Sequence, residues 1–157
     1  TGRLRLASSV VREVLQGLEN LKDIQTKVAR SMAVAGGKIV RDEAKLRAPV
    51  ETGTLRGAIY LAYREGKSTD TTVVYAVTWN SRKAPHGHLQ EFGHWAVQGG
   101  KRGKGGTETS WVPAKPFLRP AFEASLARMS QAMMERGRER LAELLRDMYT
   151  PRDEEFV

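Results

Sequence analysis

Residues 48–56 read Ala-Pro-Val-Glu-Thr-Gly-Thr-Leu-Arg, and this stretch decides where the first long helix ends and the chain turns back. Pro49 disfavours the α conformation in the residue before it, so the stretch ends a helix. Gly53 can adopt a positive φ, and Thr52 can hydrogen-bond to nearby backbone, so together they predict a tight corner. We therefore expect a helix before the corner and a strand after it that contains Leu55.

A long helix is predicted before this corner. Apolar residues recur there at spacings of three and four along one face: Leu21, Ile24, Val28, Met32, Ala35 and Ile39. Asn20 is suited to cap the N-terminus of this helix. The Gly36-Gly37 pair weakens it, and either close packing against another element or a bend would explain the pair. Residues 1–20 form a short helix or an arm.

Two strands are predicted after the corner. Apolar residues on one face predict the first strand at residues 55–63, and clear alternation predicts the second at 73–79. The polar residues between them, 64–70, predict a hairpin loop. Residues 98–110 are rich in Gly, Lys and Thr and predict a mobile loop, after which Trp111-Val112 could add a short strand.

A second long helix is predicted near the end of the chain. Its apolar face runs from Phe122 to Met148, and Pro120 is acceptable only in its first turn. The order helix, strands, helix predicts the α+β class: a small antiparallel sheet packed with two long helices, plus extended loops. We expect a single domain over residues 21–150, followed by an acidic tail at 151–157.

Composition narrows the possible functions. The chain has 157 residues, a net charge of +8 and no cysteine, which excludes disulfides, thiolate metal sites and cysteine nucleophiles. It has no apolar run long enough to cross a bilayer and no signal-peptide pattern, which favours a cytoplasmic protein or one assembled in a cytoplasm. The basic excess lies in residues 1–116 and favours nucleic acid or an acidic partner, although solubility alone explains it equally well.

Two polar clusters are candidates for a metal site and for a binding site. His86, His88 and His94 lie near Glu91, and these residue types suit zinc or nickel in a metal-dependent hydrolase. Their spacing matches no metal signature, so we expect no metal, no cofactor and no catalytic residues. A basic glycine-rich loop could contact DNA or an acidic neighbouring subunit through three residues, Lys101, Arg102 and Lys104. That loop lacks the spacing of a phosphate-binding P-loop.

Aromatic residues are frequent on the predicted strands. They could stack on nucleic-acid bases. Strand-borne aromatic residues more often belong to a core, and that interpretation is favoured here for Trp79, Trp95, Trp111, Tyr60, Tyr63 and Tyr75.

Several short segments together resemble a known family. In chain order they are Ala48-Pro49, Thr52-Gly53-x-Leu55-Arg56, Tyr75-Ala76, Glu91-Phe92-Gly93 and the run from Pro113 to Ala121. Their order and spacing over residues 20–148 resemble the gene-ten-like tail-component family of long-tailed bacteriophages. The chain departs from the family pattern in a longer insertion at 77–90, in His94 where Thr is common, and in the Gly/Lys loop.

The resemblance implies a non-enzymatic structural protein of the virion neck or tail, assembled in the host cytoplasm. It implies a homo-oligomeric ring, of six subunits, that completes the tail and contacts the head connector and the tail tube or terminator around the DNA channel, without a membrane. The residues expected to define the subunit structure or its interfaces are Pro49, Glu51, Thr52, Gly53, Leu55, Arg56, Glu91, Phe92, Gly93, Pro116, Phe117, Arg119 and Pro120. For Phe92 and Phe117 a core role is equally expected. The alternative, based on charge, is a stand-alone basic nucleic-acid-binding module.

Overall fold

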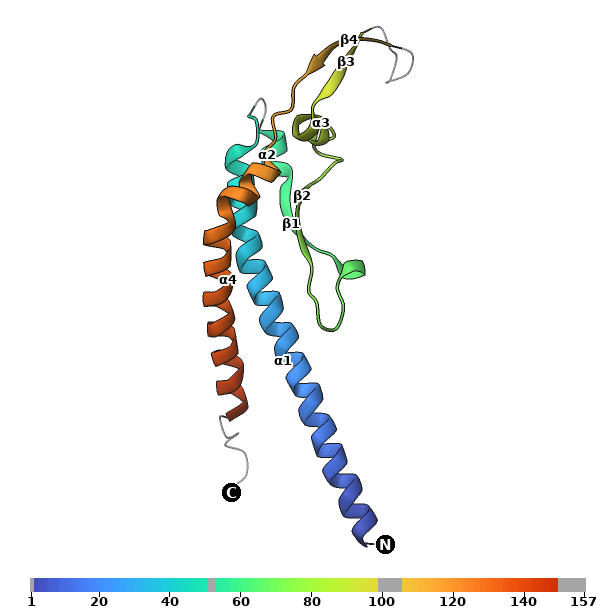
Figure 1. Ribbon diagram of the computed structural model, residues 1–157, viewed down its shortest axis with the longest axis vertical. Coiled ribbons are helices and arrows are strands. Elements are labelled where there is room, and N and C mark those ends of the chain that lie inside the picture. The colour runs from blue at the N-terminus through green and yellow to red at the C-terminus, as the bar shows by residue number, and fades with distance from the viewer. Residues whose placement is uncertain (1, 51–52, 99–105, 150–157) are drawn as a thin grey trace. The chain divides into compact units, whose positions relative to one another are not determined.

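The computed structural model describes residues 2–50, 53–98 and 106–149 (Figure 1). Their elements, in chain order, are α1 (Gly2–Arg47), α2 (Thr54–Ala58), β1 (Ile59–Tyr63), the 3₁₀ helix η1 (Glu65–Lys67), β2 (Tyr75–Trp79), α3 (Gly87–Phe92), β3 (His94–Gln98), β4 (Thr107–Val112) and α4 (Leu118–Tyr149). The strands form two separate antiparallel pairs, β1 with β2 and β3 with β4. The predicted α+β class is confirmed, with two small sheets where the sequence predicted one.

The chain divides into two compact units by its internal contacts. Unit 1 comprises Thr1–Gly36, Tyr63–Tyr75 and Ser130–Val157, and unit 2 comprises Gly37–Ala62 and Ala76–Met129. Both long helices therefore contribute to both units. The expected domain boundaries, at residues 20/21 and 150/151, stay a prediction.

Helix α1 is longer than the sequence predicted. It begins at Gly2, so Asn20 lies inside the helix and the prediction that Asn20 caps its N-terminus is wrong. A glycine costs about 1 kcal/mol in a helix interior relative to alanine, so Gly17 weakens α1 without breaking it. The chain has no proline before Pro49, and the apolar spacing that begins at Val11 continues through Leu21. The helix ends at Arg47, next to the predicted corner.

Unit 1 consists mainly of α1 and α4. Gly137 of α4 lies against Met32 of α1, where an added Cβ would come 2.8 Å from the methionine sulfur. The Arg30 guanidinium lies 5.2 Å from the centre of the Tyr63 ring, which in turn packs on Tyr75 at 5.3 Å. Aromatic and cation–π contacts of this kind attach the segment between β1 and β2 to α1.

Unit 2 holds the hydrophobic core. The residues of this core come from α1 and the residue after it, from α2 and β1, from the segments that precede α3 and α4, and from the start of α4: Ala44, Ala48, Leu55, Ala58, Ile59, Ala84, Phe117 and Ala121. Trp79 packs edge-on against Phe117 with ring centres 6.0 Å apart. At Gly37 an added Cβ would come 2.5 Å from a methyl carbon of Leu61. Close packing therefore explains one of the two glycines in α1.

The first predicted strand begins too early. Residues 54–58 form α2, and β1 starts only at Ile59. The Gly57 amide donates to the Gly53 carbonyl at 3.0 Å, which closes a helical turn directly after the corner. This turn buries Leu55 and Ala58 together, because residues three apart share a helix face.

The β3–β4 hairpin was largely missed. Pairs such as Trp95 with Trp111 and Gln98 with Thr107 define its register, and a bulge interrupts it between Ala96 and Val97. Residues 107–110 therefore belong to β4, and the prediction of a loop through residue 110 is wrong. The length and the Gly/Lys-rich composition of residues 98–110 indicated a loop rather than a strand. The pairing of β4 with β3 can be seen only in the three-dimensional structure. Residues 99–105 lie outside the described part of the chain.

Candidate assembly surface

The corner after α1 is closed by its own backbone and by one arginine. Gly53 has a φ of 74°, in the left-handed region that glycine adopts without strain. The Arg56 side chain donates through Nε to the carbonyl of Lys45 at 2.8 Å. A cationic side chain commonly satisfies the last carbonyls of a helix in this way. Two further predicted residues, Glu51 and Thr52, lie outside the described residues.

Glu91 joins the second motif to the third. Its Oε2 accepts hydrogen bonds from the amides of Phe117 at 2.8 Å and Leu118 at 3.0 Å, and its Oε1 accepts one from the Arg119 amide at 3.2 Å. These amides open α4, where a helix has no backbone acceptors of its own and carries partial positive charge. Glu91 is only 9% exposed, so it is a buried carboxylate satisfied by three backbone donors.

Gly93 allows the chain to turn out of α3 at a position closely surrounded by other residues. Its φ is 74°, and an added Cβ would lie 2.7 Å from the Trp111 ring and 2.9 Å from the Ala114 nitrogen. Nearby, the Lys115 amide donates to the Gln90 carbonyl at 2.7 Å. Backbone packing as close as this leaves no room for any side chain larger than hydrogen.

The two phenylalanines of the motifs have opposite surroundings. Phe117 is 0% exposed and lies in the core of unit 2, whereas Phe92 is 72% exposed. A core role is therefore right for Phe117 and wrong for Phe92. The rings of Trp95 and Trp111, 5.6 Å apart across the β3–β4 hairpin, are each half exposed. The predicted core position is wrong for these two tryptophans, because the hairpin is two-stranded and its faces are not enclosed.

Ion pairs stabilise the helices of each unit. In unit 2, Glu43 pairs with Arg128 at 2.7 Å and with Arg47 at 2.8 Å. The hydrogen bond from Arg128, followed by that from Arg47, holds the pKa of Glu43 below its ordinary value of 4.5. The acceptance of two guanidinium hydrogen bonds favours the charged form of the carboxylate.

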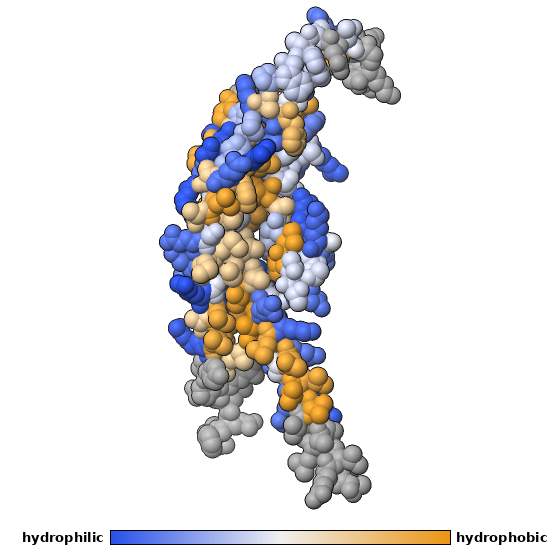
Figure 2. Space-filling model, in the orientation of Figure 1, coloured by the Kyte–Doolittle hydropathy of each residue, from blue (hydrophilic) through white to orange (hydrophobic). Residues whose placement is uncertain are grey.

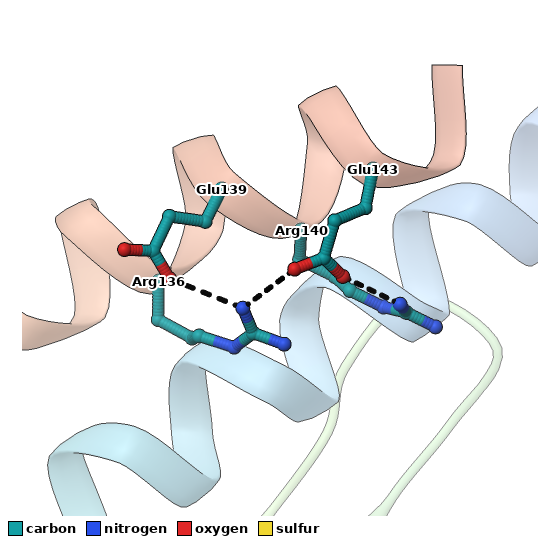
Figure 3. A network of polar contacts seen from close by, with 4 residues as sticks. All are labelled: Arg136, Glu139, Arg140 and Glu143. Carbon is teal, nitrogen blue, oxygen red and sulfur yellow. Dashed lines mark hydrogen bonds and ion pairs between the residues drawn. The ribbon is translucent and has the colours of Figure 1, made fainter. Parts of the chain in front are cut away.

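A second network lies on α4 in unit 1 (Figure 3). Arg136 contacts Glu139 and Glu143, and Arg140 contacts Glu143 at 2.7 Å. Hydrogen bonds from Arg140 and then Arg136 lower the pKa of Glu143, while the bond to Glu143 raises the pKa of Arg136. These pairs follow the helical spacing, so they stabilise α4 itself.

The histidines predicted as metal candidates do not form a metal site in the described part of the chain. His86 and His94 line a cavity of about 270 Å³ together with Pro49, Gly53 and Leu55. Among residues 2–50, 53–98 and 106–149, no three His, Asp or Glu side chains are grouped as metal ligands. The oxygens of Glu91 face the amides of α4 instead. The basic residues Lys101, Arg102 and Lys104 lie outside the described residues.

Large apolar side chains are exposed in both units. In unit 2 they include Leu46, Val50, Phe92, Trp95, Val97 and Trp111. In unit 1 they include Val11, Val14, Leu15, Leu18, Leu21, Met134 and Met148. Contiguous exposed apolar surface commonly marks an interaction site. Sequence reasoning missed the α1 residues before Leu21, although their spacing of three and four was the available signal.

One protein family matches this chain. The family described as "Bacteriophage HK97-gp10, putative tail-component" matches residues 12–93, which is just over half of the chain. The chain belongs to this family, which confirms the resemblance inferred from its motifs. The family is described as a tail component, which supports a structural role in a bacteriophage tail. The match ends at Gly93 and does not include the Pro113–Ala121 motif.

Two other comparisons and one property complete the findings. No curated protein and no solved structure matched the chain. Within the described residues, no helix combines the length and apolar character needed to cross a membrane. As a phage tail component, the protein is expected in the virion.

Proposed function

We propose that this tail component forms a homo-oligomeric ring of six subunits that completes the tail and joins it to the head connector around the DNA channel. Membership of the tail-component family gives the setting. The observation that carries the proposal is the exposed apolar surface in both units, which a lone subunit leaves in contact with water. Subunits in a ring cover such surfaces with each other.

The β3–β4 hairpin supports assembly independently. An isolated two-stranded hairpin is marginally stable in water, and this one pairs only with itself in the described structure. It also exposes about half of Trp95, of Trp111 and of Val97. Tryptophan is enriched at the energetic centres of protein interfaces. A neighbouring subunit or a tail protein placed against this face would stabilise the hairpin.

The motif residues have a separate role in this proposal. Glu91, Gly93 and Phe117 hold the fold of unit 2, so they define the shape that each subunit presents. Phe92, which follows Glu91 directly, is a motif residue whose large apolar side chain is exposed. A ring requires head-to-tail contacts between different patches of identical subunits, and rigid corners provide such patches at low entropic cost.

The test is assembly with partners. The purified chain, near virion concentration, is mixed with head connector and tail-tube assemblies, and the products are weighed by native mass spectrometry and imaged. We expect a sixfold ring, either alone or on one of these partners. A chain that stays monomeric and binds neither partner would contradict the proposal.

The net charge of +8 favours one further contact, with DNA. In the ring, basic side chains would face the phosphates in the channel without reading sequence. The alternative, a stand-alone nucleic-acid-binding module, predicts tight binding of free duplex without a protein partner. Tight binding of free duplex at moderate salt by the isolated chain, with no protein partner, would favour the module over the ring.

A further inference from the structure

The N-terminal half of α1 carries an apolar ridge, defined here as Val11, Val14, Leu15 and Leu18. These four side chains are between 53% and 57% exposed. In Figure 2 the orange surface continues along this part of α1 to the edge of the grey N-terminal residues. Val11 to Leu18 spans two turns of helix, so the ridge is a continuous surface rather than scattered residues.

The chain's own α4 stops short of this ridge. The two helices run antiparallel in unit 1, where Gly137 lies against Met32. Twelve residues further along α4, Tyr149 is its last described residue and lies opposite about residue 20 of α1. The other described segment of unit 1 contacts α1 at Thr26 and Arg30. In the described structure of unit 1, therefore, the ridge is left in contact with solvent.

The spacing of the ridge predicts a helical partner. Successive positions separated by three and four residues continue from the ridge down α1: Val11, Val14, Leu18, Leu21, Gln25, Val28 and Met32. Six of these seven positions are apolar, Gln25 being the exception, and we call the row they form the seam of α1. A repeat of seven with apolar residues at its first and fourth positions is the pattern of helices that pack side by side. The C-terminal part of this seam faces α4, and the ridge is its uncovered continuation.

Unit 1 also contains an open apolar groove. Its volume is about 360 Å³, and its lining includes Leu21, Ile24, Gln25, Val28, Met32 and Leu141. Among the described residues, those that line it carry no charged side chain. A groove of this kind accepts the apolar face of a helix.

We propose that the α1 ridge of one copy docks into the unit 1 groove of a second copy. The inference rests on the proposed ring and names one contact between its subunits. A second copy can fill the groove because each chain carries both parts of the contact. It has an uncovered ridge and an unfilled groove, and both belong to the same heptad seam of α1. Ridge and groove are different patches, as a head-to-tail contact that closes into a ring requires.

Disulfide trapping tests the contact directly, because the chain contains no cysteine. One variant carries Leu18→Cys in the ridge, a second carries Gln25→Cys in the groove, and a control carries Glu13→Cys at an exposed polar residue of the same helix. After mild oxidation, a mixture of the first two is expected to give cross-linked heterodimers, and neither variant alone should cross-link efficiently. Cross-linking of Leu18→Cys with itself would indicate a symmetric ridge-to-ridge contact and would overturn the proposal.

A second measurement follows assembly by sedimentation of the full chain. Leu18→Gln should raise the concentration needed for assembly at least tenfold, whereas the control Glu13→Gln, at an exposed polar residue of the same helix, should leave it within twofold. Leu18 is more than half exposed in the subunit, so circular dichroism should show an unchanged fold. Normal assembly of Leu18→Gln would overturn the ridge contact and leave the proposed ring intact.

Two further outcomes would show that a second copy does not cover the ridge. A wild-type chain that never self-associates would overturn both the ring and this contact. If removal of residues 151–157 makes a monomeric chain associate through Leu18, the chain's own C-terminal segment covers the ridge, and the proposal is wrong.

Discussion

Units 1 and 2 of this chain differ in how completely each buries its own apolar side chains and pairs its own polar groups. In unit 2, Phe117 is fully buried, and Glu91 accepts hydrogen bonds from three amides at the start of α4, those of Phe117, Leu118 and Arg119. In unit 1, Leu144 is the only hydrophobic residue counted as buried among the described residues, and the ridge of α1 is exposed. The difference indicates that unit 2 is stabilised from within, whereas unit 1 depends on what packs against it.

The largest expected effect is at Glu91. Glu91→Ala removes an acceptor shared by three amides, and an unsatisfied buried donor costs about 1–3 kcal/mol. We expect a loss of about 3 kcal/mol in the free energy of unfolding, measured by urea denaturation.

Two variants make this test specific. Glu91→Gln keeps one carbonyl oxygen and should lose less stability than Glu91→Ala. Glu123→Ala removes an exposed carboxylate that pairs with Arg119 four residues away, and it should cost about 0.5 kcal/mol or less. Equal losses for Glu91→Ala and Glu123→Ala would show that the capping of α4 does not stabilise unit 2.

A pair of glycine substitutions should have effects of opposite sign. Gly93→Ala places a Cβ 2.7 Å from Trp111 at a positive φ, and it should destabilise the chain by about 1–3 kcal/mol. Gly17→Ala lies in α1 with no atom within 4 Å of the added Cβ, and it should stabilise the chain by about 0.5–1 kcal/mol.

Thermal unfolding of the two glycine variants in parallel gives the measurement. If Gly93→Ala is neutral, the exit from α3 is less tightly packed than described. If Gly17→Ala has no effect on stability, the N-terminal half of α1 is not helical in the isolated subunit.

The smallest expected effect is a loss of folding stability at acidic pH. Hydrogen bonds from Arg128 and Arg47 hold the pKa of Glu43 below 4.5 in the folded state, so the unfolded chain binds more protons near and below that pH. The contribution of Glu43 is therefore complete above about pH 4.5 and is lost as the pH falls through the folded-state pKa. Glu143 acts in the same direction, because Arg140 and Arg136 lower its pKa.

The variant Glu43→Gln isolates this contribution. Its melting temperature should fall less steeply between pH 5 and pH 3 than that of the wild type. Identical slopes would mean that the carboxylate forms the same contacts in the unfolded chain or that solvent screens the pair completely.

Much of the fold could be predicted from local sequence. Pro49 determines where α1 stops, because its ring excludes the α conformation before it, and Gly53 determines the corner. The second long helix and its Pro120 were also predicted, since both follow from spacing and from the preference of proline for a first turn. Two of the predictions that failed concern short segments, the β3–β4 hairpin and the turn at 54–58. The hairpin is defined by the pairing of two strands, and the turn buries Leu55 and Ala58 in the core, so neither was evident from local spacing.

The sequence by itself determined the α+β class, the ends of the long helices near the prolines, and the motifs that resemble the tail-component family. Those features depend on backbone sterics and on spacing within one element. Only the tertiary structure decided what each motif residue does. Glu91 and Phe117 are 26 residues apart, and no local pattern shows that the carboxylate of one caps the helix that begins beside the other. The same holds for α1: its apolar spacing is visible in the sequence, but which residues are exposed depends on where α4 ends beside it.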